Sequence, residues 1–138
     1  IPFSRVVSAL AAIIDEIRPY EVYIPSDLDV HTDHKIIFQA AVSCCKTFRR
    51  PFVRRILSYE TVSETDFGLN RDAFNPNVYV DISHYLDKKI KVFNIYESEN
   101  GRPPFPRSAE VIRAQAVVRG AVSGVKAAEA FMLLKEMH

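Results

Sequence analysis

The sequence predicts an α/β protein with a mainly parallel sheet that is covered by helices on both faces. Short β-prone runs alternate with segments of helical apolar spacing along the 138 residues. Strands that alternate with helices are typical of parallel sheets, because each crossover helix lies on a face of the sheet. The length suits one domain, and a hydrophobic content of 48% is sufficient for its core.

The first half of the chain predicts two helix–strand pairs. Ser4 is a suitable N-cap for the first helix, and Pro19 stops it. Pro25 ends the first strand, and Thr32 or Asp33 is expected to cap the second helix. The expected elements are a helix over residues 4–17, a strand over 22–24, a helix over 33–47 and a strand over 54–60, followed by a polar loop over 61–75.

The second half predicts one more strand and three helices. Residues 78–82 form a β-prone run, and Ser83 is expected to cap a helix with an apolar stripe of Leu86, Ile90 and Phe93. A loop with three prolines then leads to Ser108, a good cap. The last segments are predicted as helices over residues 109–119 and 125–137, broken around Gly120 and Gly124.

The charge balance argues against a nucleic-acid partner. The chain carries 18 basic and 17 acidic residues, for a net charge of +1, whereas nucleic-acid-binding domains are strongly basic. A local basic cluster is interpreted as a solvated rim, because charge runs usually face solvent. It comprises Lys46, Arg49, Arg50, Arg54 and Arg55.

The apolar stretches, the first residues and the cysteines also predict the cellular compartment. No apolar stretch approaches the ~20 residues of a membrane span, and the first residues lack the basic start and cleavage site of a signal peptide. Cys44 and Cys45 are neighbours on a helical pattern, which predicts two free, buried thiols in a reducing compartment. We therefore expect a cytoplasmic protein. Because the chain starts at Ile1 rather than at a methionine, we also expect a processed or truncated one.

The most reactive side chains gather at His31-Thr32-Asp33-His34. This motif follows the apolar run of residues 21–25 and opens the second helix, and such strand-to-helix edges are where open α/β sheets build their sites. His31 and His34 are three residues apart, so on a helical turn they share a face and can address one centre. Catalytic zinc takes three protein ligands and a water. Two interpretations stay open on spacing alone: a metal site, or a capping or hydrogen-bonding role for His31 and Asp33.

A second pair, His84 and Asp87, is interpreted as structural. If Ser83 caps the third helix, both residues fall in its first turn, where a carboxylate interacts favourably with the helix dipole.

The motif His31-Thr32-Asp33-His34 resembles the second signature of the LmbE-like, PIG-L type N-acetylglucosaminyl deacetylases, in which a His-x-Asp-His block follows a strand and opens a helix. Further blocks continue the resemblance in the family's order. They are residues 80–83 with 86–90, residues 96–99, residues 106–108 with Glu110 and Ile112, and residues 119–120 with 128–131. The order of the blocks carries the resemblance, since no single block is strongly specific.

The resemblance implies a Rossmann-like three-layer fold, with residues 1–138 as the C-terminal portion of a single deacetylase domain. The family's first signature, His-Pro-Asp-Asp-Glu, has no counterpart in this sequence. That block supplies a histidine and an aspartate to the metal and a second aspartate as general base. The resemblance therefore implies a sugar N-deacetylase, a hydrolase of linear amide C–N bonds, that is incomplete without an N-terminal segment or companion chain.

By position, the resemblance implies that His34 is a ligand to Zn²⁺. It implies that His31 stabilises the oxyanion and protonates the leaving amine, while Asp33 orients His31 and tunes its charge. This is chemically coherent, because a carboxylate beside an imidazole favours the imidazolium and zinc activates water.

An N-acetylated sugar or glycoconjugate is the substrate that the resemblance implies. Asp29, Glu60, Ser63 and Arg107 are candidate substrate contacts from loops. Solvation of the loop is the alternative for Asp29, and an ion pair with an acidic residue such as Glu110 is the alternative for Arg107.

A different class of function stays open beside the enzyme. It is a non-catalytic carbohydrate-binding or assembly module on the same fold, with a homo-oligomer as a further expectation.

Overall fold

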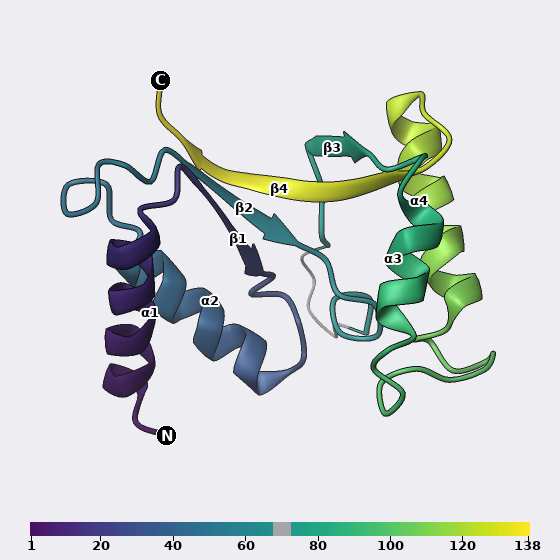
Figure 1. The fold of residues 1–138 in the computed structure, drawn as a ribbon, viewed down its shortest axis with the longest axis horizontal. Coiled ribbons are helices and arrows are strands. Elements are labelled where there is room, and N and C mark those ends of the chain that lie inside the picture. Colours follow the sequence, from purple (N-terminus) through teal and green to yellow (C-terminus); the bar gives the residue numbers. More distant parts are fainter. Residues whose placement is uncertain (68–72) are drawn as a thin grey trace. The chain divides into compact units, whose positions relative to one another are not determined.

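The computed structural model describes residues 1–67 and 73–138, and it divides the chain into two compact units. The first unit contains Ile1–Asn75 and Phe131–His138, and the second contains Pro76–Ala130. In chain order the elements are α1 (Phe3–Ile17), β1 (Glu21–Pro25), α2 (Thr32–Cys44), β2 (Arg55–Tyr59), β3 (Val78–Asp81), α3 (Leu86–Phe93), α4 (Ala109–Ser123) and β4 (Ala128–Glu136) (Figure 1). The predicted loop over 61–75 includes residues 68–72, which lie outside the described part.

The sheet is mixed rather than mainly parallel. Hydrogen bonding orders its strands β1-β2-β4-β3. β1 and β2 run parallel, with Glu21 opposite Arg55, whereas β2 and β4 run antiparallel, with Tyr59 opposite Phe131. The α/β class is confirmed, but the prediction of a mainly parallel sheet is wrong, because the last segment of the chain is a strand.

That last segment was predicted as a helix over residues 125–137, and the prediction is wrong. Alanine, glutamate, leucine, methionine and lysine dominate β4, and all are good helix formers, so local propensity favours a helix. Pairing with β2 overrides this preference, as tertiary context often does. The turn before β4 starts at Gly124, whose φ of 77° lies in the left-handed region and ends α4.

Gly120 does not break the final helix, contrary to the prediction, but lies inside α4. A Cβ atom at this position would lie 2.7 Å from the carbonyl oxygen of Val125 and 2.8 Å from the backbone of Ala127. Only glycine allows the chain to pass so close to the helix on its way into β4.

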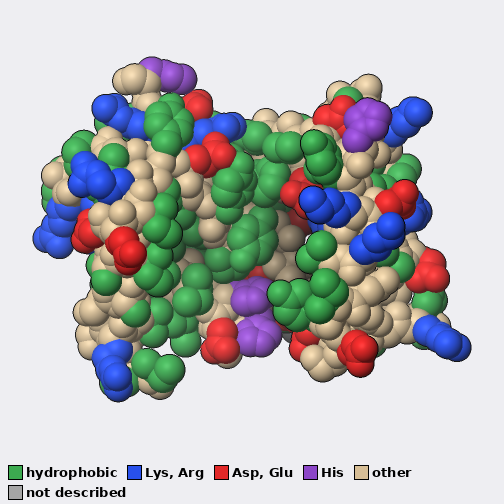
Figure 2. Space-filling model, in the orientation of Figure 1, with side chains coloured by type: hydrophobic (Ala, Val, Ile, Leu, Met, Phe, Trp, Pro, Cys, Tyr) green, Lys and Arg blue, Asp and Glu red, His purple; other side chains and the backbone are tan. Residues whose placement is uncertain are grey.

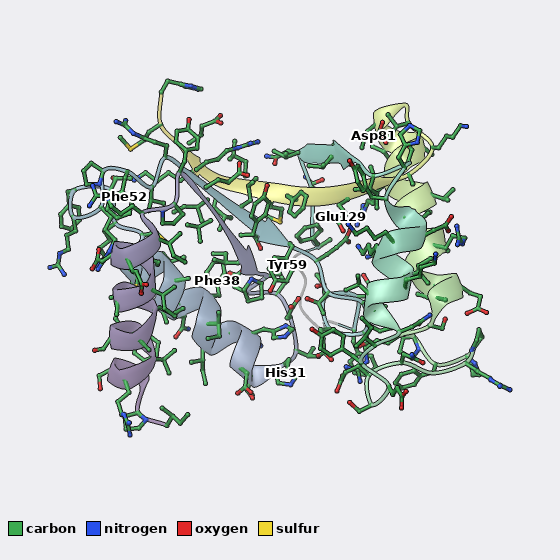
Figure 3. All side chains as sticks on the ribbon, in the orientation of Figure 1. His31, Phe38, Phe52, Tyr59, Asp81 and Glu129 are labelled. Carbon is green, nitrogen blue, oxygen red and sulfur yellow. The ribbon has the colours of Figure 1, made fainter. Side chains whose placement is uncertain are left out.

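The first unit is built around an apolar core between α1, α2 and the β1–β2 pair. Its buried members are Ile14, Ile24, Ala41, Cys44, Cys45, Val53 and Ile56. Phe38 and Phe52 pack against this core (Figure 3). The prediction of two buried thiols is confirmed, because Cys44 and Cys45 are free and each is 2% exposed. The predicted cap at Ser4 is wrong, since α1 already begins at Phe3.

The second unit has its own core between α3 and α4. Its buried members are Ile82, Leu86, Ile90, Ile112, Ala116 and Ala127. Ser108 caps α4 as predicted, by accepting a hydrogen bond from the Val111 N–H at 3.2 Å. The predicted cap at Ser83 is wrong, because α3 begins at Leu86 and the Ser83 hydroxyl instead accepts from the Ala127 N–H.

Asp87 lies in the first turn of α3, as predicted, but the same prediction is wrong for His84, which precedes the helix and its N-cap Tyr85. Its carboxylate accepts a hydrogen bond from Arg113 at 2.7 Å, and this contact lowers the pKa of Asp87. The structural interpretation of Asp87 therefore holds. Across the described residues, no helix is both long enough and apolar enough to cross a membrane.

Candidate functional site

The predicted histidines lie at the carboxyl end of β1, in the first unit. β1 ends at Pro25 and α2 begins at Thr32, so His31 stands at the junction of loop and helix (Figure 3). Because β2 runs parallel to β1, the loop after Tyr59 leaves the same edge of the sheet. This is the edge at which open α/β sheets build their sites.

His34 is held by a buried carboxylate. Its Nδ1 atom lies 2.7 Å from Oδ2 of Asp29. The Asp29 side chain has no exposed surface, whereas the His34 side chain is 28% exposed. A carboxylate buried this deeply needs hydrogen-bond donors, and a neutral imidazole that donates from Nδ1 keeps the lone pair on Nε2 free. His34 therefore presents Nε2 as the nitrogen that can bind a metal or accept a proton.

The local backbone brings Asp29 into this position. The Ser26 hydroxyl accepts a hydrogen bond from the Leu28 N–H at 3.1 Å, and the Ser26 carbonyl accepts from the Asp29 N–H at 3.3 Å. This tight turn directs the Asp29 side chain inward, while neighbouring Asp27 stays exposed. Loop solvation is therefore the wrong description of Asp29.

A second loop completes the surroundings of Asp29. The Thr65 hydroxyl donates a hydrogen bond to Oδ1 of Asp29. The same loop is tied to the first by a hydrogen bond from the Val30 N–H to the Glu64 carbonyl at 3.2 Å. Burial and the negative charge of Asp29 raise the pKa of Tyr59, the last residue of β2. Asp29 is thus bonded through both carboxylate oxygens inside the first unit.

His31 caps α2. Its Nδ1 atom accepts a hydrogen bond from the backbone N–H of Asp33 at 3.2 Å. The interpretation of His31 as a capping residue is confirmed, and the prediction that Thr32 or Asp33 caps this helix is wrong. Because Nδ1 accepts, the proton of a neutral His31 ring is on Nε2. The two imidazole rings stack with centroids 4.9 Å apart, and histidine side chains reach the visible surface side by side (Figure 2).

The structure links Asp33 to His31 through the backbone amide. The carboxylate of Asp33 belongs to an exposed residue in the first turn of α2, where it interacts favourably with the helix dipole. Among the described residues of this site, the hydrogen bond between a carboxylate and an imidazole joins Asp29 to His34 and not Asp33 to His31.

The candidate substrate contacts fall in different places. Glu60 and Ser63 follow β2, and Ser63 has a φ of 74°, a left-handed conformation that is uncommon for serine. Asp29, predicted as a contact, is buried behind His34. Arg107 belongs to the second unit, where it forms an ion pair with Glu99 at 2.8 Å instead of with Glu110.

His34 fits a single position in a metal site. Within the part of the chain that the structure describes, no group of three or more His, Cys, Asp or Glu side chains is arranged to hold a metal ion. A partly exposed imidazole with a buried carboxylate on its other nitrogen is the usual arrangement of a histidine ligand and its outer partner. Within the described residues, His34 is therefore a single imidazole with the surroundings of a histidine ligand, and a metal site here would need further ligands from elsewhere.

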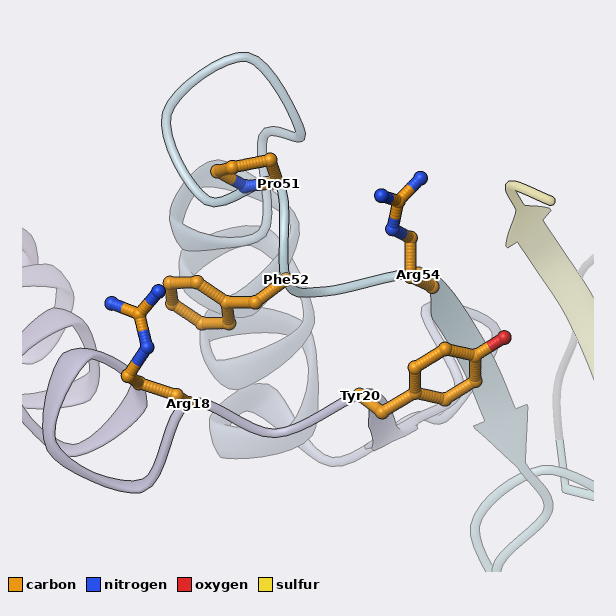
Figure 4. Close-up of a pocket in the computed structure, with 5 residues that line it drawn as sticks. All are labelled: Arg18, Tyr20, Pro51, Phe52 and Arg54. Atoms are coloured by element: carbon orange, nitrogen blue, oxygen red, sulfur yellow. The ribbon is translucent and has the colours of Figure 1, made fainter.

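A pocket of about 450 Å³ lies away from the histidines in the first unit, where the chain enters β1 and β2 (Figure 4). It is lined by Arg18, Tyr20, Pro51, Phe52 and Arg54. The predicted solvated rim of basic residues is only partly correct. Arg50 and Arg55 form ion pairs with Asp15 and Glu21, each at 2.7 Å.

Comparisons with known proteins identify a shared fold. No protein-family model matches the sequence, and no curated protein matches it. The conserved protein TT1542 from Thermus thermophilus superposes with a TM-score of 0.73 and 22% identity, over 100% of this chain and 61% of that chain. The N,N'-diacetylchitobiose deacetylase from Pyrococcus horikoshii, solved with its inhibitor MPG, superposes with a TM-score of 0.72 and 21% identity, over 97% of this chain and 53% of that chain.

The chain thus spans less than two thirds of either of these two solved chains. At these identities the likeness concerns the fold. The chain has the α/β fold that is seen in part of a deacetylase of known structure.

Proposed function

We propose that this chain is the C-terminal portion of a zinc-dependent hydrolase that removes the N-acetyl group from an acetamido sugar. One observation carries the proposal: the buried Asp29 carboxylate bonds Nδ1 of His34 and leaves Nε2 available at the carboxyl edge of β1. The fold shared with a diacetylchitobiose deacetylase supports the reaction class.

His34 would be one ligand of the zinc ion. When bound, zinc polarises the acetamide carbonyl and lowers the pKa of a water molecule. Asp29 would accept a hydrogen bond from the Nδ1–H of His34, which leaves Nε2 as the nitrogen that binds the metal and makes it a stronger ligand. The remaining ligands and the general base would come from a segment outside residues 1–138.

His31 would act on the carbonyl oxygen and on the leaving amine. Hydrolysis adds the water oxygen to the carbonyl carbon, breaks the C–N bond and releases acetate and an amine. The amine needs a proton to leave, and an imidazolium at His31 can donate it from Nε2. Before that, the same N–H can stabilise negative charge on the carbonyl oxygen.

Asp33 has a defined part in this scheme. Nδ1 of His31 accepts from the Asp33 N–H in the structure, so it carries no proton there. When His31 is protonated, Nδ1 becomes a donor, and the carboxylate of the same aspartate is the acceptor that we assign to it. Glu60 and Ser63, on the loop after β2, are the residues that we assign to sugar hydroxyls.

The test is acetate release by the complete protein, loaded with zinc and offered a panel of acetamido sugars. His31→Ala should keep zinc bound but reduce acetate release by roughly a hundredfold or more, the usual scale of general acid–base catalysis. A nearly unchanged rate removes His31 from the mechanism. Sugar binding without acetate release by the wild-type protein would favour a carbohydrate-binding module instead.

A further inference from the structure

We infer that Thr65 is a positioning residue that fixes the Asp29 carboxylate and, through it, the nitrogen that His34 presents. The inference rests on the proposed function, because the presented nitrogen matters as a metal ligand. Thr65 lies 36 residues after Asp29 in the sequence, on the loop that follows β2. Its hydroxyl donates to Oδ1 of Asp29, while Oδ2 contacts His34 at 2.7 Å.

The Thr65 hydroxyl has its direction set by the loop. Its oxygen accepts a hydrogen bond from the Thr61 N–H at 2.8 Å, so its single proton is left for Asp29. The Thr65 N–H in turn donates to the Thr61 carbonyl at 3.0 Å. These two bonds close a short turn that carries the hydroxyl to the carboxylate.

Two loops therefore hold one carboxylate. The loop after β1 contributes Asp29 and leads into His34, and the loop after β2 contributes Thr65. Since the Asp29 side chain has no exposed surface, solvent does not reach it to replace a lost donor. Removal of the Thr65 hydroxyl takes away the donor that Oδ1 has within the described residues. The carboxylate can then rotate, so that Nδ1 of His34 loses a fixed acceptor.

The expected loss of zinc affinity can be taken from residues that hydrogen-bond to metal ligands in other proteins. Loss of such a partner typically costs 10- to 100-fold in metal affinity. Thr65 acts through Asp29 and not on the imidazole itself, so we expect the lower end, roughly tenfold.

The experiment compares three variants of the complete protein. Thr65→Val removes the hydroxyl at nearly constant volume, and Thr65→Ser restores a hydroxyl. Thr61→Val is the matched control on the same loop, because the Thr61 Oγ1 atom is buried and has no hydrogen-bond partner in the described part of the structure. Thr65→Ala replaces the valine variant if valine prevents folding.

Two readouts are taken. Ring ¹⁵N chemical shifts of His34 in the metal-free protein report which nitrogen carries the proton, and competition with a chelator gives the Kd for zinc. We expect Thr65→Val to reduce the share of Nδ1-protonated His34 and to weaken zinc binding roughly tenfold. Thr65→Ser and Thr61→Val should match the wild type in both.

An unchanged tautomer in Thr65→Val overturns the inference, and so does an equal loss in Thr61→Val. If the wild-type protein binds no zinc, the proposed function fails. The tautomer measurement on the metal-free protein still decides whether Thr65 positions His34.

Discussion

The contact between Asp29 and His34 can be tested by one isosteric change, Asp29→Asn. The carboxylate is fully buried and bonded through both oxygens, to Nδ1 of His34 at 2.7 Å and to the hydroxyl of Thr65. Asparagine keeps an acceptor for Thr65 but presents an NH₂ group to the imidazole. Nδ1 must then accept, and the proton of the neutral ring moves to Nε2, the nitrogen proposed to bind zinc.

The expected loss of zinc affinity is 10- to 100-fold, the range for outer-shell partners of metal-bound histidines. This corresponds to about 1.4–2.8 kcal/mol. Because both hydrogen bonds are still made, the free energy of unfolding should fall by only about 1 kcal/mol. Asp27→Asn is the control, since this exposed aspartate lies on the same loop.

The assay is a zinc competition titration of the complete protein, with urea unfolding measured alongside. Zinc affinity of Asp29→Asn within twofold of the wild type would refute the tautomer argument. An equal loss in Asp27→Asn would point to a general effect of charge on the loop.

Two further predictions concern the fold. Gly120→Ala should lower the free energy of unfolding by about 1–3 kcal/mol, the usual cost of overpacking, because the new methyl meets the Val125 carbonyl oxygen at 2.7 Å; urea unfolding measures this, and an unchanged midpoint contradicts the close approach. Burial raises the pKa of the Cys45 thiol to about 11, so the folded protein should hold it as unreactive thiol at pH 8 and lose this protection only as the pH rises towards that value or when urea unfolds the chain. Iodoacetamide labelling followed by mass spectrometry checks this, and labelling of Cys45 in the folded protein at pH 8 as fast as in urea would contradict it.

The regular elements near the site could be predicted because their signals are local. The β-prone residues before Pro25 predict a strand, and the apolar spacing after His31 predicts a helix, without information from the rest of the chain. β4 could not be predicted in this way. Its residues favour a helix, and pairing with its neighbours in the sheet makes it a strand.

The site shows the same division between local and long-range information. The capping role of His31 follows from its place at a helix start, although histidine is not among the favoured capping residues. The role of Asp29 could not be predicted from the loop alone, because its hydrogen-bond partner Thr65 lies 36 residues further along the chain. A lone aspartate in a polar loop gives no sequence signal that separates a solvated carboxylate from a buried one.

Zinc content tests the central claim most directly. The complete wild-type protein and its His34→Ala and His84→Ala variants should each be purified and analysed for bound metal. His84→Ala is the control, because it removes an exposed histidine of the second unit. We expect stoichiometric zinc in the wild type and in His84→Ala, and almost none in His34→Ala. Full retention of zinc by His34→Ala would contradict the assignment of this imidazole as a ligand and, with it, the proposed hydrolase.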